Sequence, residues 1–325
     1  MDVDRKFIIN SARSTGFQPD ITEKAYRLAV LLQEIRNHPV LSKELILKGG
    51  TAINFFYLPL PRLSVDLDFN FIGGLAKEEA DRRRDGIKRY LNDIFSFLKY
   101  QVSERHEYGL HQFFLSYTNS ASNLDVIKTE VNYLLRISLL PGQEKRIDLP
   151  FIKDLKITTR VLALEEVYGG KIVALLSRGA ARDLFDVYAL IDAKVKFKKT
   201  ILKKTVIFLG CLIREDFRKF SANKIHSISG RNIKTDLSPL LRKTAIPSRE
   251  KMIATVEPFL KGLLTMTKRE YGYVDYFFQG QYKPERLFSK KEVVDIESLR
   301  NHPLALWKQQ HIQEWLKRKG KRKLQ

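Results

Sequence analysis

Cysteine is nearly absent from this chain of 325 residues, which contains a single one, Cys211. This scarcity excludes a framework of disulfide bonds and any zinc site that is built from several thiolates. The six histidines lack the spacing of metal ligands, which disfavours a histidine-based zinc site as well. Cys211 lies in the apolar segment 206–213, so we expect it to be buried in the core.

Long hydrophobic runs are also missing. The longest clean apolar stretch, Thr205 to Ile213, is far shorter than the roughly 20 residues that a membrane-spanning helix needs. The segment from Met1 to Lys6 has no apolar stretch behind a basic start, so it does not have the form of a secretory signal. These features together predict a cytoplasmic protein that makes no use of a membrane.

Acidic residues are scarce relative to basic ones, because 37 Asp and Glu stand against 58 Lys and Arg and give a net charge of +21. Residues 191–325 contain 31 basic and 13 acidic residues, a net charge of +18, whereas residues 1–190 carry only +3. This asymmetry favours a polyanion partner, nucleic acid before others, that is held by the C-terminal part. A solvated basic surface with no particular partner is the alternative.

Hydrophobic periodicity divides the chain into a mixed part and a helical part. Apolar residues at helical spacing predict helices over residues 21–37, 51–57 and 77–100. Alternating apolar and polar residues predict strands over residues 65–72, 101–104, 112–117, 126–135 and 156–160. From Leu164 onward the spacing is mostly helical, with breaks at Gly169-Gly170 and at Gly179. We therefore expect an α+β domain over residues 1–190 that is joined to an all-helical, basic domain over residues 191–325.

Two aspartates, Asp66 and Asp68, lie two residues apart on a predicted strand and therefore face the same side of it. Carboxylates this close repel each other unless a cation lies between them, and Mg²⁺ prefers carboxylates together with substrate phosphate. Upstream, Gly49 and Gly50 open the predicted helix that contains Thr51, and free backbone N–H groups at such a position favour a phosphate. Each piece alone is often only a turn or a solvated strand face. Their combination favours metal-dependent phosphoryl chemistry on a nucleotide.

A third carboxylate usually completes a two-metal site, and Glu130 is the best candidate. It lies on the polar face of the predicted strand 126–135, together with Lys128 and Asn132. A charged residue in the middle of a strand is disfavoured unless it has a role or faces water. Glu130 is therefore a metal ligand, a base or a surface residue.

A second cluster follows at residues 165–186. If one helix ran through it, Lys171, Arg178, Arg182 and Asp186 would share a single stripe on its surface. Such a cationic stripe could bind a triphosphate, and the acidic residue at its end could hold the lysine by ion pairing. An exposed ladder of salt bridges is an equally good interpretation of the spacing alone, and Gly179 is a possible break in the helix.

The two motif blocks together resemble the AbiEii/AbiGii-type toxin nucleotidyltransferases, the group that includes the MenT toxins. The first block, at 48–69, contains KGGTAI and then R-x-S-x-D-x-D-F. The second, at 169–190, contains G-x-K-x-x-A-L-x-x-R-x-x-x-R-D-x-x-D-x-x-A-L. The resemblance implies a DNA-polymerase-β-like nucleotidyltransferase fold, with a mixed sheet joined to a helical domain. It also implies a toxin of a toxin–antitoxin or phage-abortive system that a partner antitoxin neutralises.

The resemblance also implies roles for single residues in the first block. Asp66 and Asp68 match the metal-binding pair, and Glu130 stands where the fold places its third carboxylate. The remaining matches are the phosphate-binding loop and two positions beside the metal pair: Gly49, Gly50 and Thr51, and Arg62 and Ser64.

In the second block, Lys171 matches the essential lysine of the family. Of the two aspartates in the last motif, Asp186 is favoured as the functional one, and Asp183 as a partner of Arg182 that holds the turn. Lys171, Arg178, Arg182 and Asp183 are accordingly expected at the nucleotide.

The function that this resemblance implies is an NTP-dependent modification of RNA. Two Mg²⁺ ions would be held by Asp66, Asp68 and Glu130. The 3′-hydroxyl of an RNA, the tRNA acceptor end before others, would attack the α-phosphate of an NTP, and translation would be blocked. The basic helical domain would hold the RNA backbone. The alternatives are nucleotidyl or phosphoryl transfer to a protein hydroxyl, and a catalytically silent module that binds nucleic acid or the antitoxin.

Overall fold

A seven-stranded mixed sheet forms the centre of the N-terminal half, with the strand order β3-β4-β5-β2-β1-β7-β6. The computed structural model describes residues 3–58, 60–73, 76–107, 109–147, 149–152, 157–243 and 246–322, with side chains up to residue 318. The strands are β1 Leu45–Lys48, β2 Asp66–Phe71, β3 Gln101–Glu107, β4 Leu110–Thr118, β5 Leu124–Asn132, β6 Gln143–Arg146 and β7 Thr158–Val161. β2 lies near the middle, antiparallel to β1 and parallel to β5.

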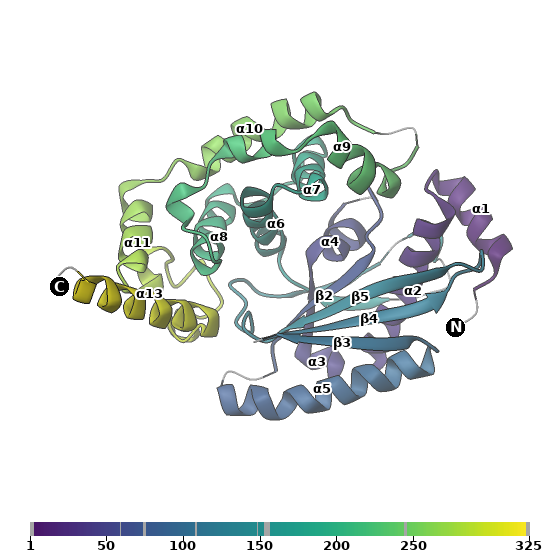
Figure 1. Cartoon of the computed structure of the whole chain (residues 1–325), viewed down its shortest axis with the longest axis horizontal. Coiled ribbons are helices and arrows are strands. Elements are labelled where there is room, and N and C mark those ends of the chain that lie inside the picture. The colour runs from purple at the N-terminus through teal and green to yellow at the C-terminus, as the bar shows by residue number, and fades with distance from the viewer. Residues whose placement is uncertain are drawn as a thin grey trace.

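Helices surround the sheet and make up the rest of the chain (Figure 1). Those of the N-terminal half are α1 Arg5–Thr15, α2 Pro19–Asn37, α3 Leu41–Glu44, α4 Gly49–Ala52, which continues as a π-helical turn Ile53–Tyr57, and α5 Lys77–Phe97. The later ones are α6 Leu164–Arg178, α7 Ala181–Asp192, α8 Lys199–Leu212, α9 Gly230–Asn232, α10 Arg249–Leu264, α11 Lys268–Phe278, α12 Ile296–Arg300 and α13 Pro303–Arg322. Figure 1 shows α6 to α11 as an arc on one side of the sheet, with α4 between the two halves.

The pattern of β2 explains why this strand has a buried side and a polar side. Leu67, Phe69 and Phe71 are buried in the core, as the alternation predicts. Asp66 and Asp68 consequently face the other way, toward the helical half. The strand is thus both a structural centre and a carrier of carboxylates.

Most of the predicted elements are confirmed, and three elements of the N-terminal half were missed. The helices expected over 21–37 and 77–100 are α2 and α5, and the predicted strand pair at 101–117 is β3 and β4. β7 begins at Thr158, and Lys156, where the last strand was expected to begin, lies outside the described residues. α1, α3 and β6 were not predicted, and the last two contain only four residues each.

Two boundaries differ from the prediction for a local reason. The strand expected over 126–135 ends at Asn132, whose Oδ1 accepts hydrogen bonds from the backbone N–H groups of Leu134 and Leu135, both at 2.9 Å, and so turns the chain. Gly169 and Gly170 do not break the helix but lie inside α6. A Cβ atom at Gly169 would lie 2.5 Å from Cγ2 of Thr205 on α8, so this glycine lets the two helices pack closely.

The hydrophobic core runs without interruption past residue 190. One cluster of buried apolar side chains includes Leu184 of α7, Leu202 of α8 and Val256 of α10, and α6 packs on α8. Cys211 is buried in the same core, as expected. The division into domains at residue 190 stays a prediction. Among the described residues, no helix has the length and hydropathy that crossing a membrane requires.

Candidate active site

The register of the sheet brings three of the predicted carboxylates and a lysine to one place. Asp68 pairs with Lys48 of β1 on one side and with Glu130 of β5 on the other. Asp66 pairs with Lys128 of β5. Residues that are 62 positions apart in the sequence, such as Asp68 and Glu130, are therefore direct neighbours on adjacent strands.

The carboxyl groups of Asp68 and Glu130 lie close enough for each to influence the pKa of the other. Burial, opposed by Lys48 and reinforced by Glu130 and Asp66, raises the pKa of Asp68 to about 6. Burial also acts on Glu130, but hydrogen bonds from Lys128 and Gln112 outweigh it and lower the pKa of that carboxyl. Carboxylates that are brought this close by the register form a place where a cation is favoured.

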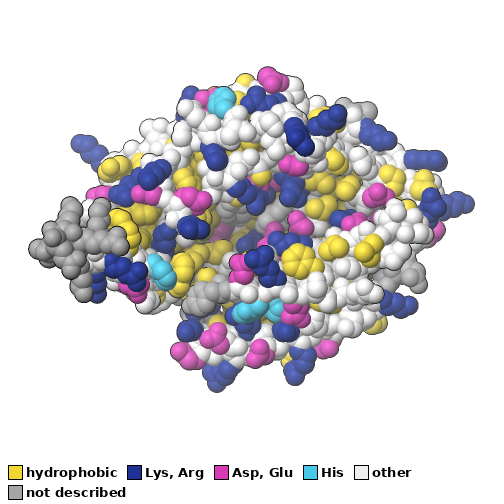
Figure 2. Space-filling model, viewed as in Figure 1, with side chains coloured by type: hydrophobic (Ala, Val, Ile, Leu, Met, Phe, Trp, Pro, Cys, Tyr) yellow, Lys and Arg dark blue, Asp and Glu magenta, His cyan; other side chains and the backbone are white. Residues whose placement is uncertain are grey.

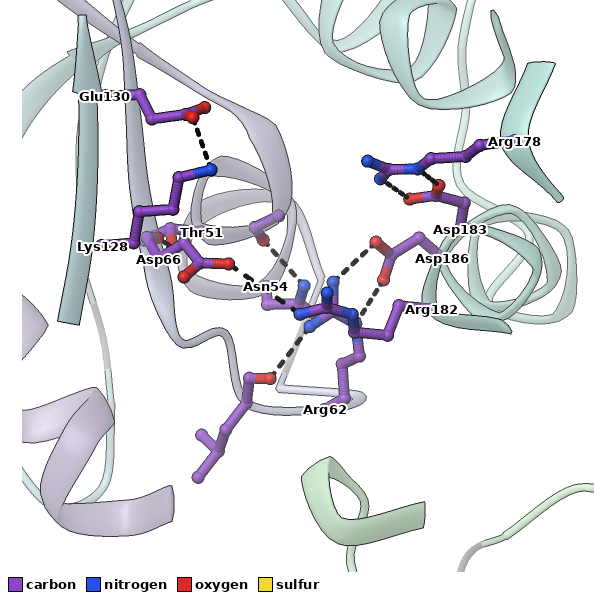
Figure 3. Close-up of polar contacts among 12 residues, drawn as sticks. Thr51, Asn54, Arg62, Asp66, Lys128, Glu130, Arg178, Arg182, Asp183 and Asp186 are labelled. Carbon is purple, nitrogen blue, oxygen red and sulfur yellow. Dashed lines mark hydrogen bonds and ion pairs between the residues drawn. The ribbon is translucent and has the colours of Figure 1, made fainter. Parts of the chain in front are cut away.

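The donor set at this place fits a divalent metal ion, because it consists of carboxylate oxygens alone. Asp66, by contrast, is half-exposed, and its Oδ2 lies 3.8 Å from Nη1 of Arg182 (Figure 3). Within the described ranges, no three His, Cys, Asp or Glu side chains are already gathered around one point. The metal-binding role of Asp66, Asp68 and Glu130 stays a prediction, and it requires Asp66 to exchange its long contact with Arg182 for the metal.

The glycine turn at the start of α4 is shaped by its contact with the carboxylate of Asp68. Gly49 has a φ of +75°, a left-handed conformation, and a Cβ atom there would lie 2.2 Å from Oδ2 of Asp68. A Cβ atom at Gly50 would lie 2.9 Å from Nη2 of Arg62 and 3.1 Å from Oγ of Ser64. Both glycines therefore allow a close approach between the turn and the residues beside the aspartate pair.

The hydroxyl of Thr51 is used inside the protein. It donates a hydrogen bond to the backbone carbonyl of Asp66, and Asn54 Nδ2 donates to the carbonyl of Gly50 at 2.7 Å. The bond from Thr51 fastens the turn to β2, and the bond from Asn54 stays within the helical segment that starts at Gly49 (Figure 3). The predicted contact of Thr51 with a phosphate remains untested.

A buried network of ion pairs connects the loop before β2 to α6 and α7. Arg62 binds Asp186 through two parallel hydrogen bonds, Nε to Oδ1 at 2.7 Å and Nη2 to Oδ2 at 2.8 Å. The Nζ atom of Lys171 lies 2.8 Å from Oδ1 of Asp183 and 3.2 Å from Oδ2 of Asp186. Burial raises the pKa of Asp186, but Arg62 and Lys171 outweigh it, so that the pKa is lowered.

For the second motif block, one expectation is confirmed and one is corrected. The predicted break at Gly179 exists, because α6 ends at Arg178 and Gly179 takes a left-handed conformation at φ +63° before α7 begins, so no single helix runs through residues 171–186. Asp183 is not a partner of Arg182. Its carboxylate accepts two hydrogen bonds from Arg178, at 2.7 and 3.0 Å, and one from Lys171, whereas Arg182 reaches Asp66 (Figure 3).

A cavity of about 430 Å³ opens between β2, α6 and α8. Four of the predicted residues, Gly49, Asp68, Lys171 and Arg178, line it, together with Lys48 of the first motif block. Figure 2 shows this face of the molecule hollowed between its two halves, with charged side chains around the rim. The volume is within the range of pockets that bind small ligands.

The other predicted residues lie behind the cavity wall or beside it. Arg62, Ser64, Asp183 and Asp186 are buried and hold the wall together, whereas Asp66 and Arg182 lie outside it. Sequence reasoning gave no role to three further residues that line the cavity: Asn70, Glu166 and His302. The alternation of β2 already placed Asn70 on the face of Asp66 and Asp68, but no signal in the sequence singled out Glu166 or His302.

Glu166 fixes the loop that forms another part of the wall. Its carboxylate accepts hydrogen bonds from the backbone N–H of Leu139, at 3.2 and 3.1 Å, and from that of Leu140 at 3.1 Å. Burial raises the pKa of Glu166 to about 7, although the two backbone donors oppose this shift. The side chain is thus a structural anchor of the loop.

Comparison with known protein families matches residues 30–255 to the family described as nucleotidyl transferase AbiEii toxin, type IV TA system. Among solved structures, MenT4, a nucleotidyltransferase toxin from Mycobacterium tuberculosis H37Rv, matches with a TM-score of 0.63 and 17% sequence identity. The match covers 84% of this chain and 94% of that chain. It confirms the expected mixed sheet with a helical region and shows the likeness of fold alone.

Two structures of CdnC from E. coli MS115-1, one in complex with HORMA-deltaN and one with ATP, each cover 92% of this chain, and 96% and 97% of their own chains, at 15% identity. Their TM-scores of 0.24 and 0.26 are too low to support an argument. No curated protein matches the sequence. The family match spans both motif blocks and well over half of the chain, and the chain therefore belongs to the AbiEii nucleotidyltransferase toxins of type IV toxin–antitoxin systems.

Proposed function

We propose that this toxin transfers a nucleoside monophosphate from an NTP to the 3′-hydroxyl of an RNA, with the tRNA acceptor end as the preferred acceptor, in a Mg²⁺-dependent reaction that blocks translation. One observation carries the proposal. A buried carboxylate that is poised for a cation, Asp68, and a lysine held by two buried aspartates, Lys171, line the same cavity. Phosphoryl transfer needs these two kinds of group, because charge develops on both sides of the reacting phosphorus.

Lys171 and Arg178 would bind the triphosphate. Asp183 holds both cations, since it accepts from Lys171 at 2.8 Å and from Arg178 at 2.7 Å. An aspartate between the two keeps their side chains oriented before the nucleotide arrives, which reduces the entropy that binding must overcome. Negative charge that builds on the departing pyrophosphate would then meet ammonium and guanidinium groups already in place.

The carboxylates of Asp66, Asp68 and Glu130 would hold two Mg²⁺ ions. Bound there, the metal would polarise the α-phosphate and lower the pKa of the attacking hydroxyl. The metal would also offset the repulsion between the carboxylates of Asp68 and Glu130. Arg182, freed from Asp66, would be available to a phosphate.

Exposed lysines at the start of the helical part are the best candidates to hold the RNA backbone. Lys194, Lys196, Lys198 and Lys199 are exposed, and none has an ion-pair partner within the described residues. Lys203 and Lys204, which follow them on α8, are instead paired with Glu270 and Glu292 at 2.7 and 2.6 Å. As in other toxin–antitoxin systems, an antitoxin would be the second partner, and both would meet the toxin in the cytoplasm.

Incubation of the purified chain with total tRNA, Mg²⁺ and each labelled NTP in turn tests the proposal. We expect label to be found on the 3′ end of tRNA, and we expect Asp66→Ala to abolish it without unfolding the protein. Asp81→Ala, an exposed change on α5, is the matched control and should retain the activity. If the label is found on protein instead of RNA, the acceptor is a protein hydroxyl. If neither is labelled, the chain is a binding module without catalysis.

A further inference from the structure

The cavity is larger and more apolar than a triphosphate requires. Beyond Asp68 and Lys171, its wall is formed by Val173 and Ala174 of α6, by Leu209 and Leu212 of α8, and by Leu304 at the start of α13. A triphosphate gains nothing from an apolar wall, whereas a flat, largely apolar ring gains free energy by leaving water for it.

Two buried polar groups in this wall have no hydrogen-bond partner. They are Oδ1 of Asn70, a residue 2% exposed, and Nε2 of His302, a residue 0% exposed. Buried polar atoms are nearly always paired, because an unpaired one costs free energy that a partner would recover. Both therefore point to a ligand with polar atoms on its rim. Asn70 stands two residues beyond Asp68 on β2, and His302 directly precedes α13.

The hydrogen bond on the other ring nitrogen of His302 determines what Nε2 offers. The backbone N–H of Ala305 lies 3.3 Å from Nδ1, which caps the first turn of α13. Since Nδ1 accepts there, the proton of the neutral ring is assigned to Nε2. Burial lowers the pKa of His302 to about 3, so the ring is neutral at physiological pH. Nε2–H is consequently an unused hydrogen-bond donor.

We propose that the inner part of this cavity is a nucleobase pocket, and that the Nε2–H group of His302 selects bases with a carbonyl oxygen on the edge opposite the sugar. The inference rests on the proposed function, which anchors the triphosphate at Lys171 and Asp68. From that anchor, the edge opposite the sugar reaches furthest along the cavity wall, and His302 belongs to the apolar part of that wall, where its ring packs against Phe208 of α8.

The chemistry of this edge separates the four nucleotides into two pairs. Uracil and guanine carry an oxygen there, which accepts from Nε2–H, whereas cytosine and adenine carry an amino group, which would bring two donors together. Asn70 does not separate them, because a carboxamide can turn to donate or to accept. UTP and GTP should therefore be used better than CTP and ATP, by about tenfold or more for a buried hydrogen bond that is made or lost.

Two variants of His302 separate this role from its part in capping α13. Asn in place of His302 retains an acceptor at the position of Nδ1 and removes the donor, whereas Gln places an amide N–H near the position of Nε2. We expect His302→Asn to abolish the preference and His302→Gln to retain it. His311→Asn, an exposed change on the same helix that does not line the cavity, is the matched control.

The experiment measures binding and transfer separately for the full-length chain with Mg²⁺. Binding of UTP, GTP, CTP and ATP is compared by equilibrium dialysis, and kcat/KM for transfer to total tRNA is compared for the same four. A preference for CTP or ATP, or an unchanged preference in His302→Asn with a normal circular dichroism spectrum, would overturn the nucleobase assignment and leave the proposed function standing. If no NTP bound, both would be wrong. If all four bound with the expected preference and none was transferred, the pocket would stand and the proposed reaction would fail.

Discussion

At the scale of single residues, the second motif block is a set of charges that hold one another in place. Asp183 and Asp186 are fully buried, yet each is surrounded by cations: Lys171 and Arg178 for the first, Lys171 and Arg62 for the second. Buried charges persist only when they are paired and hydrogen-bonded. Removing one member should therefore affect both activity and stability, and experiments must separate the two effects.

Lys171→Ala should reduce the rate of nucleotide transfer by about a hundredfold or more, because the ammonium would no longer face the charge that develops on the leaving pyrophosphate. Asp183 would retain Arg178, and Asp186 would retain Arg62, so the fold should survive. Lys171→Arg need not restore the rate, since a planar fork does not replace a compact ammonium. Single-turnover transfer with labelled NTP measures the effect.

Lys203→Ala is the matched control for this change. Lys203 is similarly buried and loses an ion pair of 2.7 Å with Glu270, but it does not line the cavity. It should lower stability slightly and leave transfer intact. Equal losses of activity in both variants would assign Lys171 a structural role only.

Asp186→Asn should destabilise the protein at neutral pH by about 3–5 kcal/mol, because it leaves the buried guanidinium of Arg62 without its counter-charge. The pKa of Asp186 is lowered in the folded state, since Arg62 and Lys171 outweigh burial. The pair therefore contributes stability above the ordinary pKa of an aspartate, and this contribution is lost as the pH falls below about 4.

Urea denaturation between pH 3 and pH 7 measures this dependence. The wild-type free energy of unfolding should fall more steeply toward acid than that of Asp186→Asn, in which the group no longer titrates. Asp192→Asn, an exposed change on the same helix, should behave like the wild type. Parallel acid profiles for all three proteins would argue against a stabilising Arg62–Asp186 pair.

At the scale of elements, hydrophobic periodicity was enough to predict a helix or strand where one face of that element is buried. The alternation of β2 predicted the strand and the side on which Asp66 and Asp68 lie, and the spacing in α2 predicted the helix. Sequence patterns failed to predict where an element ends when contacts with other elements determine that boundary. Gly169 continues α6 because α8 packs against it, whereas Gly179 ends the helix in a left-handed turn. The propensity of glycine is the same in both places, so sequence alone cannot distinguish them.

The predicted site residues divide in the same way. Motif spacing brought Asp68 and Lys171 into one hypothesis, and the structure places both at one cavity. The partners of the charges were not predictable, because Arg62 reaches Asp186 across 124 positions of sequence. His302 was out of reach altogether, since only the packing of α13 brings it to the cavity.

Gly49→Ala should abolish transfer and destabilise the turn before α4. The backbone there is left-handed, at φ +75°, and the added Cβ atom would lie 2.2 Å from Oδ2 of Asp68. Gly262→Ala in α10 is the control, because a Cβ atom there meets nothing within 4 Å and alanine favours a helix. Thermal unfolding and transfer assays should show loss in the first variant and equal or greater stability with full activity in the second. A fully active Gly49→Ala protein would contradict the contact with Asp68.

At the scale of the whole molecule, charge is distributed unevenly over a continuous core. Residues 191–325 carry a net charge of +18, yet their helices share buried side chains with α6 and α7. The excess of charge thus belongs to the surface of the helical part and does not mark an independently folded tail. A surface of this kind suits a polyanion whose backbone is held without regard to sequence.

Replacement of Lys194, Lys196, Lys198 and Lys199 by Gln should weaken tRNA binding and reduce the salt dependence of its binding constant. Each lost phosphate contact lowers the slope of log K against log salt by about 0.7 to 0.9, so a decrease of roughly 1 to 3 is expected. Transfer at saturating tRNA should change little. Filter binding at several salt concentrations measures the slope.

The control removes the same number of positive charges from the N-terminal half, at Arg5, Lys6, Arg13 and Lys77, which are all exposed. Its slope should stay close to that of the wild type. If the salt slope decreases by the same amount in both quadruple variants, tRNA binding depends on net charge and not on the position of these lysines. If neither changes, the basic surface serves another partner, of which the antitoxin is the first to test.

The cavity draws its walls from widely separated parts of the chain, from Lys48 at the end of β1 to Leu304 in the first turn of α13. A growing polypeptide therefore contains Asp66 and Asp68 long before it contains the last part of the cavity wall. The unfinished chain lacks part of the cavity in which we propose that the nucleotide binds. The proposed activity would accordingly arise only after Leu304 has been added and the last wall has folded into place.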